Sequence, residues 1–245
     1  MTRKRRVSIT EYEEASLITY SLGELELLLN LPPHQEMSNL ELFLAPSGID
    51  IFDDSAYKGS EPPDEPFLPL VDTVWYCTLE DSVYDAGSMI LTMQILKKTP
   101  VETHDFLDEG VFADWILDRI HIAAEAVDRP NIEYLTENNI SITDQDLSIY
   151  PKQRGDLIKL SKGGMFGYLF YTGHPSVGTG DPLIRIPINH DYALSIIIRF
   201  GSFNSDLFSS KEEIDAEKSD LLNEFLDNMR LTYPESILQQ ITKSS

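Results

Sequence analysis

The side chains that could do chemistry in this sequence are spread along it and form no motif. None of the five histidines belongs to a His-x-x-x-His pair or stands beside the single cysteine, the spacings typical of metal sites. His190 and Asp191 are adjacent and could act as a general base with its carboxylate. Together with Asn189 they are also the residue types that favour a tight turn, and we interpret them in that way.

Two other segments share part of a ligand-binding pattern but lack the residues that complete it. The glycines of 163–167 are not followed by the Lys-Ser/Thr pair of a phosphate-binding loop. Asp144, Asp146 and Ser148 have the spacing of a calcium loop, but the glycine and the closing glutamate of that loop are missing. We therefore predict no catalytic residue, no cofactor and no metal. A Ser-His-Asp set that is assembled only in space stays open.

The most unusual property of the composition is its negative charge. The chain carries 41 acidic and 19 basic residues, for a formal net charge of −22. A field of this sign repels nucleic acid and anionic lipid and steers basic proteins toward the surface. We therefore predict a basic protein partner, and neither nucleic acid nor a membrane. The alternative is that the negative charge only keeps the protein soluble and indicates no partner.

Two segments are expected to present acidic side chains to such a partner. One is the proline-rich segment 53–70, whose composition is typical of a stiff surface loop. The other is the exposed face of a helix that is expected to begin near residue 100. The candidate partner-binding residues are Asp53, Asp54, Glu61, Asp64 and Glu65 in the loop and Asp108, Asp114 and Asp118 on the helix.

Targeting signals are not evident in the sequence. The basic residues 3–6 are not followed by the apolar run of a signal peptide. No stretch approaches the roughly 18 apolar residues of a membrane span. The single cysteine, Cys77, rules out an internal disulfide and lies in a strand-like run, which predicts a buried side chain. These features predict a cytoplasmic protein.

The elements that would position the candidate residues are clearest in the C-terminal third. Residues 183–188 and 192–200 are rich in β-branched side chains and predict two strands joined by a turn. The near-continuous apolar run of the second strand predicts burial on both faces, and hence a central place in its sheet. Pro187 cannot donate to a strand ladder, which predicts either an edge strand or a bulge at that point.

Two helices are predicted from apolar residues at helical spacing. The first covers about 100–128, with a capping box that begins at Thr99 and an end before Pro130. The second covers about 211–230, with a capping box that begins at Ser210. Their remaining faces are rich in acidic residues, so we expect both helices to be long and amphipathic.

The rest of the chain predicts short strands and turns. These strands are expected at residues 17–20, 24–29, 39–45, 49–52, 71–80, 88–96, 156–160 and 165–171. The predicted fold class is α+β, with mainly antiparallel sheets covered by the two long helices. Residues 1–245 are expected to form a single domain, or two packed lobes at 1–98 and 99–245.

The C-terminal half has an element pattern that resembles known folds. The segments Tyr168–Tyr171, Ile184–Ile188, Leu194–Phe200 and the helix through Phe225–Met229 resemble the C-terminal half of PsbP-like α/β folds. The pattern also looks like that of bacterial immunity proteins, which neutralise toxins delivered by neighbouring cells. The resemblance covers about a third of the chain and includes no signature residue, so it transfers no functional residue. It implies an acidic protein that binds a toxin.

Three functional hypotheses follow from these observations. The first is a cytoplasmic binding protein, an immunity protein that occludes the active site of a secreted toxin. The second is a small hydrolase or transferase with a histidine–acid site assembled from distant residues. The third is an adaptor that associates with itself through an edge strand near Pro187. The sequence favours the first and assigns no enzymatic activity.

Overall fold

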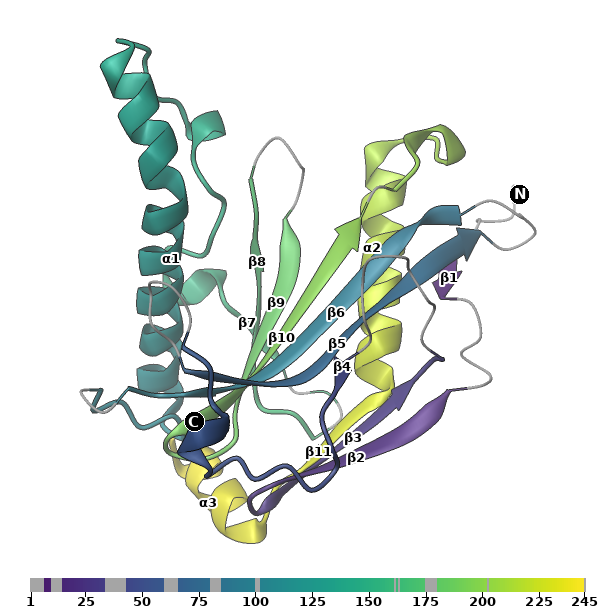
Figure 1. Ribbon diagram of the computed structural model, residues 1–245, viewed down its shortest axis with the longest axis vertical. Coiled ribbons are helices and arrows are strands. Elements are labelled where there is room, and N and C mark those ends of the chain that lie inside the picture. Colours follow the sequence, from purple (N-terminus) through teal and green to yellow (C-terminus); the bar gives the residue numbers. More distant parts are fainter. Residues whose placement is uncertain are drawn as a thin grey trace.

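The computed structural model describes residues 7–9, 15–33, 43–59, 66–79, 85–99, 102–160, 162, 164–174, 180–201 and 203–244. They form an α+β structure with a large, curled antiparallel sheet, a smaller sheet and three helices (Figure 1). The strand order of the large sheet is β1-β5-β6-β10-β9-β8-β7, and β4 pairs with β5. Its strands are β1 (Val7–Ile9), β4 (Phe43–Leu44), β5 (Phe67–Leu79), β6 (Asp85–Lys97), β7 (Ile158–Leu160), β8 (Gly167–Thr172), β9 (Asp181–Pro187) and β10 (Tyr192–Gly201).

Strand β10 lies at the centre of the large sheet, as its apolar run predicted. It pairs with β6 along its whole length and with β9 along its first half. Alternate residues of β10 enter two different apolar cores, Leu194 and Ile196 on one face and Ala193 on the other. The sheet is therefore covered on both faces at this point, which explains why the strand has almost no polar side chains.

The prediction that Pro187 marks an edge strand is wrong. Strand β9 is an interior strand, because it pairs with β10 on one side and with β8 on the other. Pro187 is tolerated because it is the last residue of β9. It lies opposite Ala193 of β10, but the pairing with β8 reaches no further than Arg185, so the N–H that proline lacks is not needed for a bond to β8. The surface suggested for the self-associating adaptor, an edge near Pro187, is therefore not an edge.

The two faces of the large sheet are covered by different elements. One face packs against helix α2 (Lys211–Asp227) and the small sheet, whose order is β11-β3-β2. The other face, at β8 and β10, packs against helix α1 (Glu109–Glu137). In Figure 1, α1 stands along one side of the large sheet, and the small sheet and helix α3 (Glu235–Ser244) lie at the lower end. The strands of the small sheet are β2 (Ser16–Leu22), β3 (Leu25–Leu31) and β11 (Met229–Thr232).

Helix α1 begins nine residues later than the sequence predicted, at Glu109. One half of the predicted capping box at Thr99 forms, since Glu102 accepts hydrogen bonds from the amide and the hydroxyl of Thr99, while the amide of Glu102 donates to the backbone carbonyl of Thr99. It closes a single turn and no helix follows. The N-cap is Asp108, whose carboxylate accepts a hydrogen bond of 2.9 Å from the amide of Val111.

Helix α1 also continues through Pro130, where the sequence predicted its end. A proline inside a helix removes one hydrogen bond and costs about 3 kcal/mol. Contacts on both sides of Pro130 compensate for this loss. The buried carboxylate of Asp128 accepts hydrogen bonds from the amide and hydroxyl of Ser148, and Asn131 donates to the carbonyl oxygen of Asp146 at 2.9 Å. The segment 146–148, which runs back along α1, thus holds the second half of the helix.

The description of two long amphipathic helices is not confirmed. Helix α1 buries apolar side chains mainly in its first half. In its second half Leu135 is buried, but Val127 and Tyr134 are exposed. Helix α2 starts as predicted, with Ser210 accepting a hydrogen bond from the amide of Glu213, but it ends at Asp227. Arg230, expected in its last turn, belongs to β11 and lies opposite Leu28. The third helix, α3, was not predicted.

Smaller differences occur in the N-terminal half. The predicted strand 49–52 is a pair of turns, and a 3₁₀ helix, η2 (Asp54–Ala56), follows it. The predicted loop 53–70 ends earlier than expected, because β5 begins at Phe67 and accommodates Pro69 beside an irregularity in its pairing with β6. Among the described residues, no helix has the length and apolarity that crossing a membrane requires.

Candidate functional site

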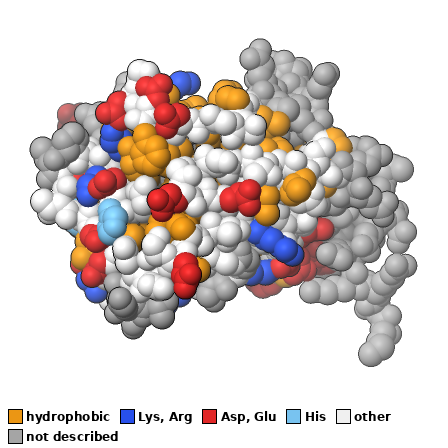
Figure 2. All heavy atoms as spheres, turned by 90° about the horizontal axis from the view of Figure 1, so that it is seen from below, with side chains coloured by type: hydrophobic (Ala, Val, Ile, Leu, Met, Phe, Trp, Pro, Cys, Tyr) orange, Lys and Arg blue, Asp and Glu red, His pale blue; other side chains and the backbone are white. Residues whose placement is uncertain are grey.

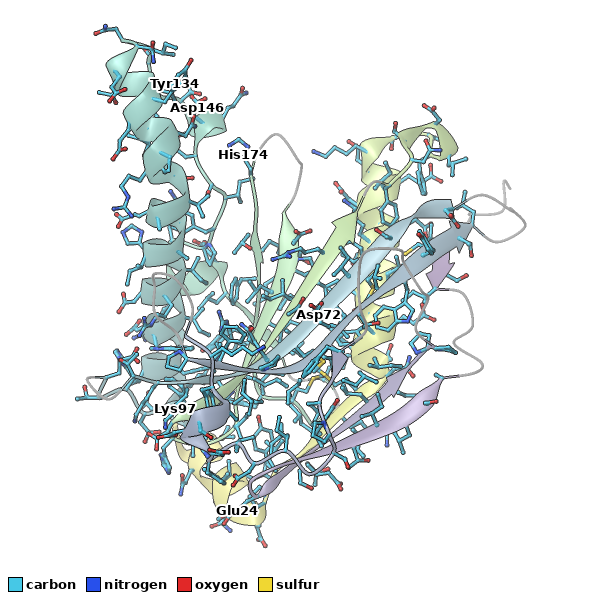
Figure 3. The ribbon with its side chains drawn as sticks, in the orientation of Figure 1. Glu24, Asp72, Lys97, Tyr134, Asp146 and His174 are labelled. Carbon is cyan, nitrogen blue, oxygen red and sulfur yellow. The ribbon has the colours of Figure 1, made fainter. Side chains whose placement is uncertain are left out.

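The two described acidic residues of the predicted loop, Asp53 and Asp54, already have roles within the chain. Asp53 caps η2, where its carboxylate accepts hydrogen bonds from the amide and hydroxyl of Ser55, and these bonds lower its pKa. Asp54 forms an ion pair with Lys97 at the end of β6. Figure 3 places Lys97 at the lower end of the molecule, on the side of α1. The candidates Glu61, Asp64 and Glu65 lie outside the described residues.

The three candidates on α1 differ from one another. Asp108 is the N-cap of the helix, so its carboxylate has a structural role. Asp114 forms a two-armed ion pair with the guanidinium of Arg154, which lowers the pKa of its carboxyl. Asp118 is exposed, and its carboxylate makes no hydrogen bond or ion pair with the described residues. Asp118 is therefore the candidate best placed to meet a partner.

Asp118 belongs to a stripe of side chains on the outward face of α1. Asp114, Asp118, Ile122 and Glu125 follow one another at spacings of three or four residues, which places them on one face of the helix. Ile122 is 44% exposed, so an apolar side chain lies on this face between carboxylates. Glu125 lies 3.2 Å from His121 and its side chain is mostly exposed. We call these four residues the acidic stripe.

Acidic side chains are not gathered into one patch on the lower end of the molecule. Figure 2 shows them on that face, interspersed with uncharged side chains and with Lys and Arg. The described ion pairs explain this distribution, since Lys97, Lys98 and Lys162 are paired with carboxylates of the chain itself. On this face the acidic side chains therefore do not form a single patch.

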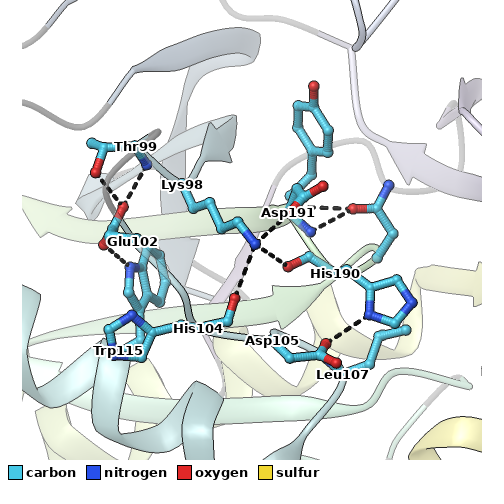
Figure 4. A network of polar contacts seen from close by, with 11 residues as sticks. Lys98, Thr99, Glu102, His104, Asp105, Leu107, Trp115, His190 and Asp191 are labelled. Carbon is cyan, nitrogen blue, oxygen red and sulfur yellow. Dashed lines mark hydrogen bonds and ion pairs between the residues drawn. The ribbon is translucent and has the colours of Figure 1, made fainter.

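A network of polar contacts joins the segment before α1 to the β9–β10 turn (Figure 4). Glu102 is one centre of the network, because it accepts hydrogen bonds from Thr99, from Trp115 Nε1 at 2.8 Å and from Arg119 Nη2 at 2.5 Å. Burial would raise the pKa of its carboxyl, but the bonds from Arg119 and Thr99 outweigh burial and lower it. Glu102 is therefore a charged anchor for the first turns of α1.

Lys98 is the other centre of the network. Its Nζ donates to the carbonyl oxygens of His104 and His190 and pairs with the carboxylate of Asp191. His190 Nδ1 lies 2.8 Å from Asp105 Oδ1. The turn itself forms as predicted, because the side chain of Asn189 accepts hydrogen bonds from the two amides that follow His190. These contacts fasten the turn to the segment that leads into α1.

The His190–Asp105 pair is the arrangement in the structure that most resembles part of a catalytic triad. A carboxylate that holds one ring nitrogen leaves the other to act as a general base. His190 borders a cavity of about 330 Å³ that Glu24, Ser236 and Ile237 also line. The side chains of His190 and Asp105 are each about half exposed, so water competes with the contact.

A second hollow lies between α1 and the β8–β9 hairpin, and we call it the α1 groove. Its volume is about 530 Å³. One wall is a face of α1 and the other is formed by the ends of β8 and β9. The lining residues are Arg119, Ile120, Ala123, Ala124, Val127, Ser148, Ile149, Tyr150, Thr172, Gly173, His174, Leu183 and Arg185. Figure 3 shows His174 beside the distal half of α1, below Asp146 and Tyr134.

The α1 groove is bridged by the segment 148–150, which is bonded to both walls. Ile149 and Gly173 exchange two backbone hydrogen bonds, of 2.7 and 3.0 Å, at the end of β8. Ser148 donates to the buried Asp128 of α1, and Tyr150 Oη lies 3.2 Å from His121 of the same helix. The groove is therefore held open by specific contacts at both sides.

The described residues that line the α1 groove include no carboxylate. Arg119 and Arg185 approach it from opposite walls, and both are partly buried. The guanidinium of Arg185 lies over the ring of Trp115, 5.9 Å from its centroid, while Arg119 bonds to Glu102. The described lining of the groove thus has apolar walls and two guanidinium groups, of which that of Arg119 is paired with Glu102, in a chain whose net charge is strongly negative.

Metal binding and thiol chemistry find little support among the described residues. No group of three or more His, Cys, Asp or Glu side chains within them is arranged to hold a metal ion. Cys77 is buried as predicted, and burial raises the pKa of its thiol to about 12, which keeps it protonated at neutral pH. Asp144 and Asp146 belong to a 3₁₀ turn, η3 (Asp144–Asp146).

The sequence did not indicate the α1 groove. Its residues come from three segments, 119–127, 148–150 and 172–185, and no motif links them. One signal was present: small and apolar residues continue along α1 at Ala123, Ala124 and Val127. Their helical spacing is typical of a buried face, and Ala124 is buried, whereas Val127 is 70% exposed.

No known family model, curated protein or solved structure matches this chain. The resemblance to immunity proteins therefore stays a prediction.

Proposed function

We propose that this protein is an acidic binding protein whose partner is a basic protein. The observation that supports the proposal is the acidic stripe, where the exposed Ile122 stands between the carboxylates of Asp118 and Glu125. An exposed apolar side chain within a charged rim is the usual composition of a protein interface. The net charge of −22 adds a field that speeds the approach of a positive partner.

We further propose that the partner is a secreted toxin, which the protein neutralises by covering its active site. The support is the resemblance of residues 168–229 to immunity proteins with a PsbP-like half. Toxins that cleave nucleic acid or bind phosphate have basic clefts, which an acidic helix face would complement. The proposal places the protein in the cytoplasm, without a role for nucleic acid or membrane in its own binding.

Purification of the tagged protein from its native cells, at low and then at moderate salt, tests the proposal. We expect one stoichiometric basic protein that is released as the salt concentration rises, because screening weakens a charged interface. A variant with Asp118→Lys and Glu125→Lys should no longer bind this partner, while a variant with Asp220→Lys, at an exposed position of α2, should still bind it. Retention by the first variant would remove the acidic stripe from the interface.

The toxin part of the proposal has its own test. The purified partner should be toxic when produced alone in a susceptible cell, and co-production of this protein should restore growth. Partner binding without toxicity would leave a binding protein of another kind. Toxicity that this protein does not relieve would contradict neutralisation.

A hydrolase or transferase is a second candidate, which the His190–Asp105 contact of 2.8 Å favours. In this case His190 would act as a general base on a nucleophile in the cavity that Ser236 also lines. We would measure the hydrolysis of p-nitrophenyl acetate by the wild-type protein and by His190→Ala and Ser236→Ala, with His121→Ala as the control. Activity that both site variants keep, or no activity in the wild type, would count against this candidate.

A further inference from the structure

The α1 groove has the size of a site for a small molecule. Small-molecule sites are mostly clefts of about 300–1,000 Å³ with apolar walls and a few polar groups that orient the ligand. The volume of about 530 Å³ lies within that range, and Ile120, Val127 and Leu183 supply apolar surface. Because segment 148–150 is bonded to both walls, this shape is part of the fold.

The charges of the groove differ from those of the rest of the chain. Acidic residues outnumber basic ones 41 to 19 in the sequence, yet the charged side chains that line the groove are Arg119 and Arg185. Two carboxylates that bond to lining residues have structural roles: Glu102 bonds to Arg119, and Asp128 bonds to Ser148. A negative group can therefore enter this place with less repulsion than it meets elsewhere on the surface.

We propose that the α1 groove binds a small amphipathic carboxylate, with its apolar body along the walls and its carboxylate toward Arg119 and Arg185. Guanidinium groups are suited to this role because their planar N–H groups match the two oxygens of a carboxylate. The cation–π contact between Arg185 and Trp115 favours one position of the guanidinium before a ligand arrives. A basic peptide is not a suitable occupant, because it would bring positive charge beside both arginines.

The space for the apolar body depends on two alanines of α1. Ala123 and Ala124 line the groove between Arg119 and Val127, where larger side chains would fill it. Ala126, on the same helix and also partly exposed, is not among the lining residues. Ala123→Trp and Ala126→Trp are therefore a matched pair, of which one fills the groove and the other adds the same side chain outside it.

Calorimetric titration of the full chain with octanoate and with octan-1-ol tests the proposal. The two probes share the apolar body and differ in the charge at one end. We expect octanoate to bind with one-to-one stoichiometry and at least tenfold more tightly than octan-1-ol. Ala123→Trp should abolish binding of both probes, and Ala126→Trp should leave both unchanged.

Replacement of one arginine separates the role of charge from that of space. Arg185→Gln should weaken octanoate binding about tenfold and leave octan-1-ol binding unchanged, with folding of each variant checked by thermal denaturation. Equal affinity of the wild type for the two probes would overturn the assignment of a carboxylate site. Failure of octanoate to bind, or unchanged binding in a folded Ala123→Trp variant, would overturn the assignment of the groove.

Discussion

Glu102 and Arg119 form an ion pair of 2.5 Å across 17 residues of chain, with only 11% and 15% of their side chains exposed. Glu102 precedes α1, and Arg119 lies in its third turn. The pair therefore fixes the direction in which the chain enters the helix. It also holds Arg119 at the edge of the α1 groove, so that one contact serves both the fold and the proposed site.

Replacement of Glu102 by Gln should lower stability and change its pH dependence. Loss of a largely buried ion-pair partner costs about 3 kcal/mol near neutral pH, because Arg119 stays behind without its carboxylate. The pKa of Glu102 is lower in the folded state than its ordinary value of 4.5, so its stabilising contribution is present above that pH and disappears as the pH falls. The difference between wild type and Glu102→Gln in urea unfolding should therefore shrink below pH 4.5.

The exposed Glu125 provides the control for this prediction. Its carboxylate lies 3.2 Å from His121 and its side chain is 66% exposed, so Glu125→Gln should change stability by less than about 0.5 kcal/mol. Equal losses in Glu102→Gln and Glu125→Gln would show that the network in Figure 4 does not anchor α1.

Reversal of charge at Asp118 and Glu125 should slow association with the basic partner. Charges at the rim of an interface act mainly on the association rate, so we expect a decrease of about tenfold at low salt and a weaker dependence on salt. Stopped-flow or surface-plasmon measurements with the captured partner give both quantities. Asp220→Lys changes the net charge in the same direction from α2, and an equally large effect there would mean that the whole field acts and not the acidic stripe.

Replacement of Gly167 by Ala should disturb the strands beneath the α1 groove. A Cβ atom at this position would lie 2.2 Å from the carbonyl oxygen of Arg185, a backbone atom that cannot move without β9. We expect a loss of about 2–3 kcal/mol in urea unfolding, as for overpacked cores. At Gly48 a Cβ meets nothing within 4 Å, so Gly48→Ala is the matched control and should change stability little. A Gly167→Ala protein as stable as wild type would be inconsistent with this packing.

Replacement of Pro130 by Ala should stabilise the protein. The substitution restores a helical N–H in the interior of α1 and removes the ring that crowds the preceding turn, an effect of about 1–3 kcal/mol. Pro234, which precedes α3, has no interior hydrogen bond to restore, so Pro234→Ala should not raise the unfolding midpoint. A decrease in the midpoint for Pro130→Ala would contradict this prediction.

Several elements could be predicted from the sequence because local interactions determine them. The long apolar run of 192–200 placed β10 in the interior of the sheet, since burial on both faces leaves no room for polar side chains. The cap at Ser210 marked the start of α2, because a side chain that accepts a backbone N–H acts within one turn. The Asn189 turn followed from the same kind of local hydrogen bond.

Other features were decided only by tertiary structure. Thr99 and Glu102 form one half of the capping box that the sequence suggested, yet Glu102 also bonds to Trp115 and Arg119, and the helix starts at Glu109. Pro130 stays within α1 because contacts from residues 146–148 outweigh its local cost.

The candidate site, too, could be predicted from the sequence only in part, and tertiary structure decided the rest. Net charge and the acidic residues can be counted in the sequence, but which carboxylates are neutralised depends on partners far along the chain, as for Asp114 and Arg154. The α1 groove joins a helix, a returning segment and a hairpin, and the volume between them exists only once all three are packed. Local propensity acts over a few residues, whereas pairing of charges and closure of a cavity depend on distances that only the folded chain defines.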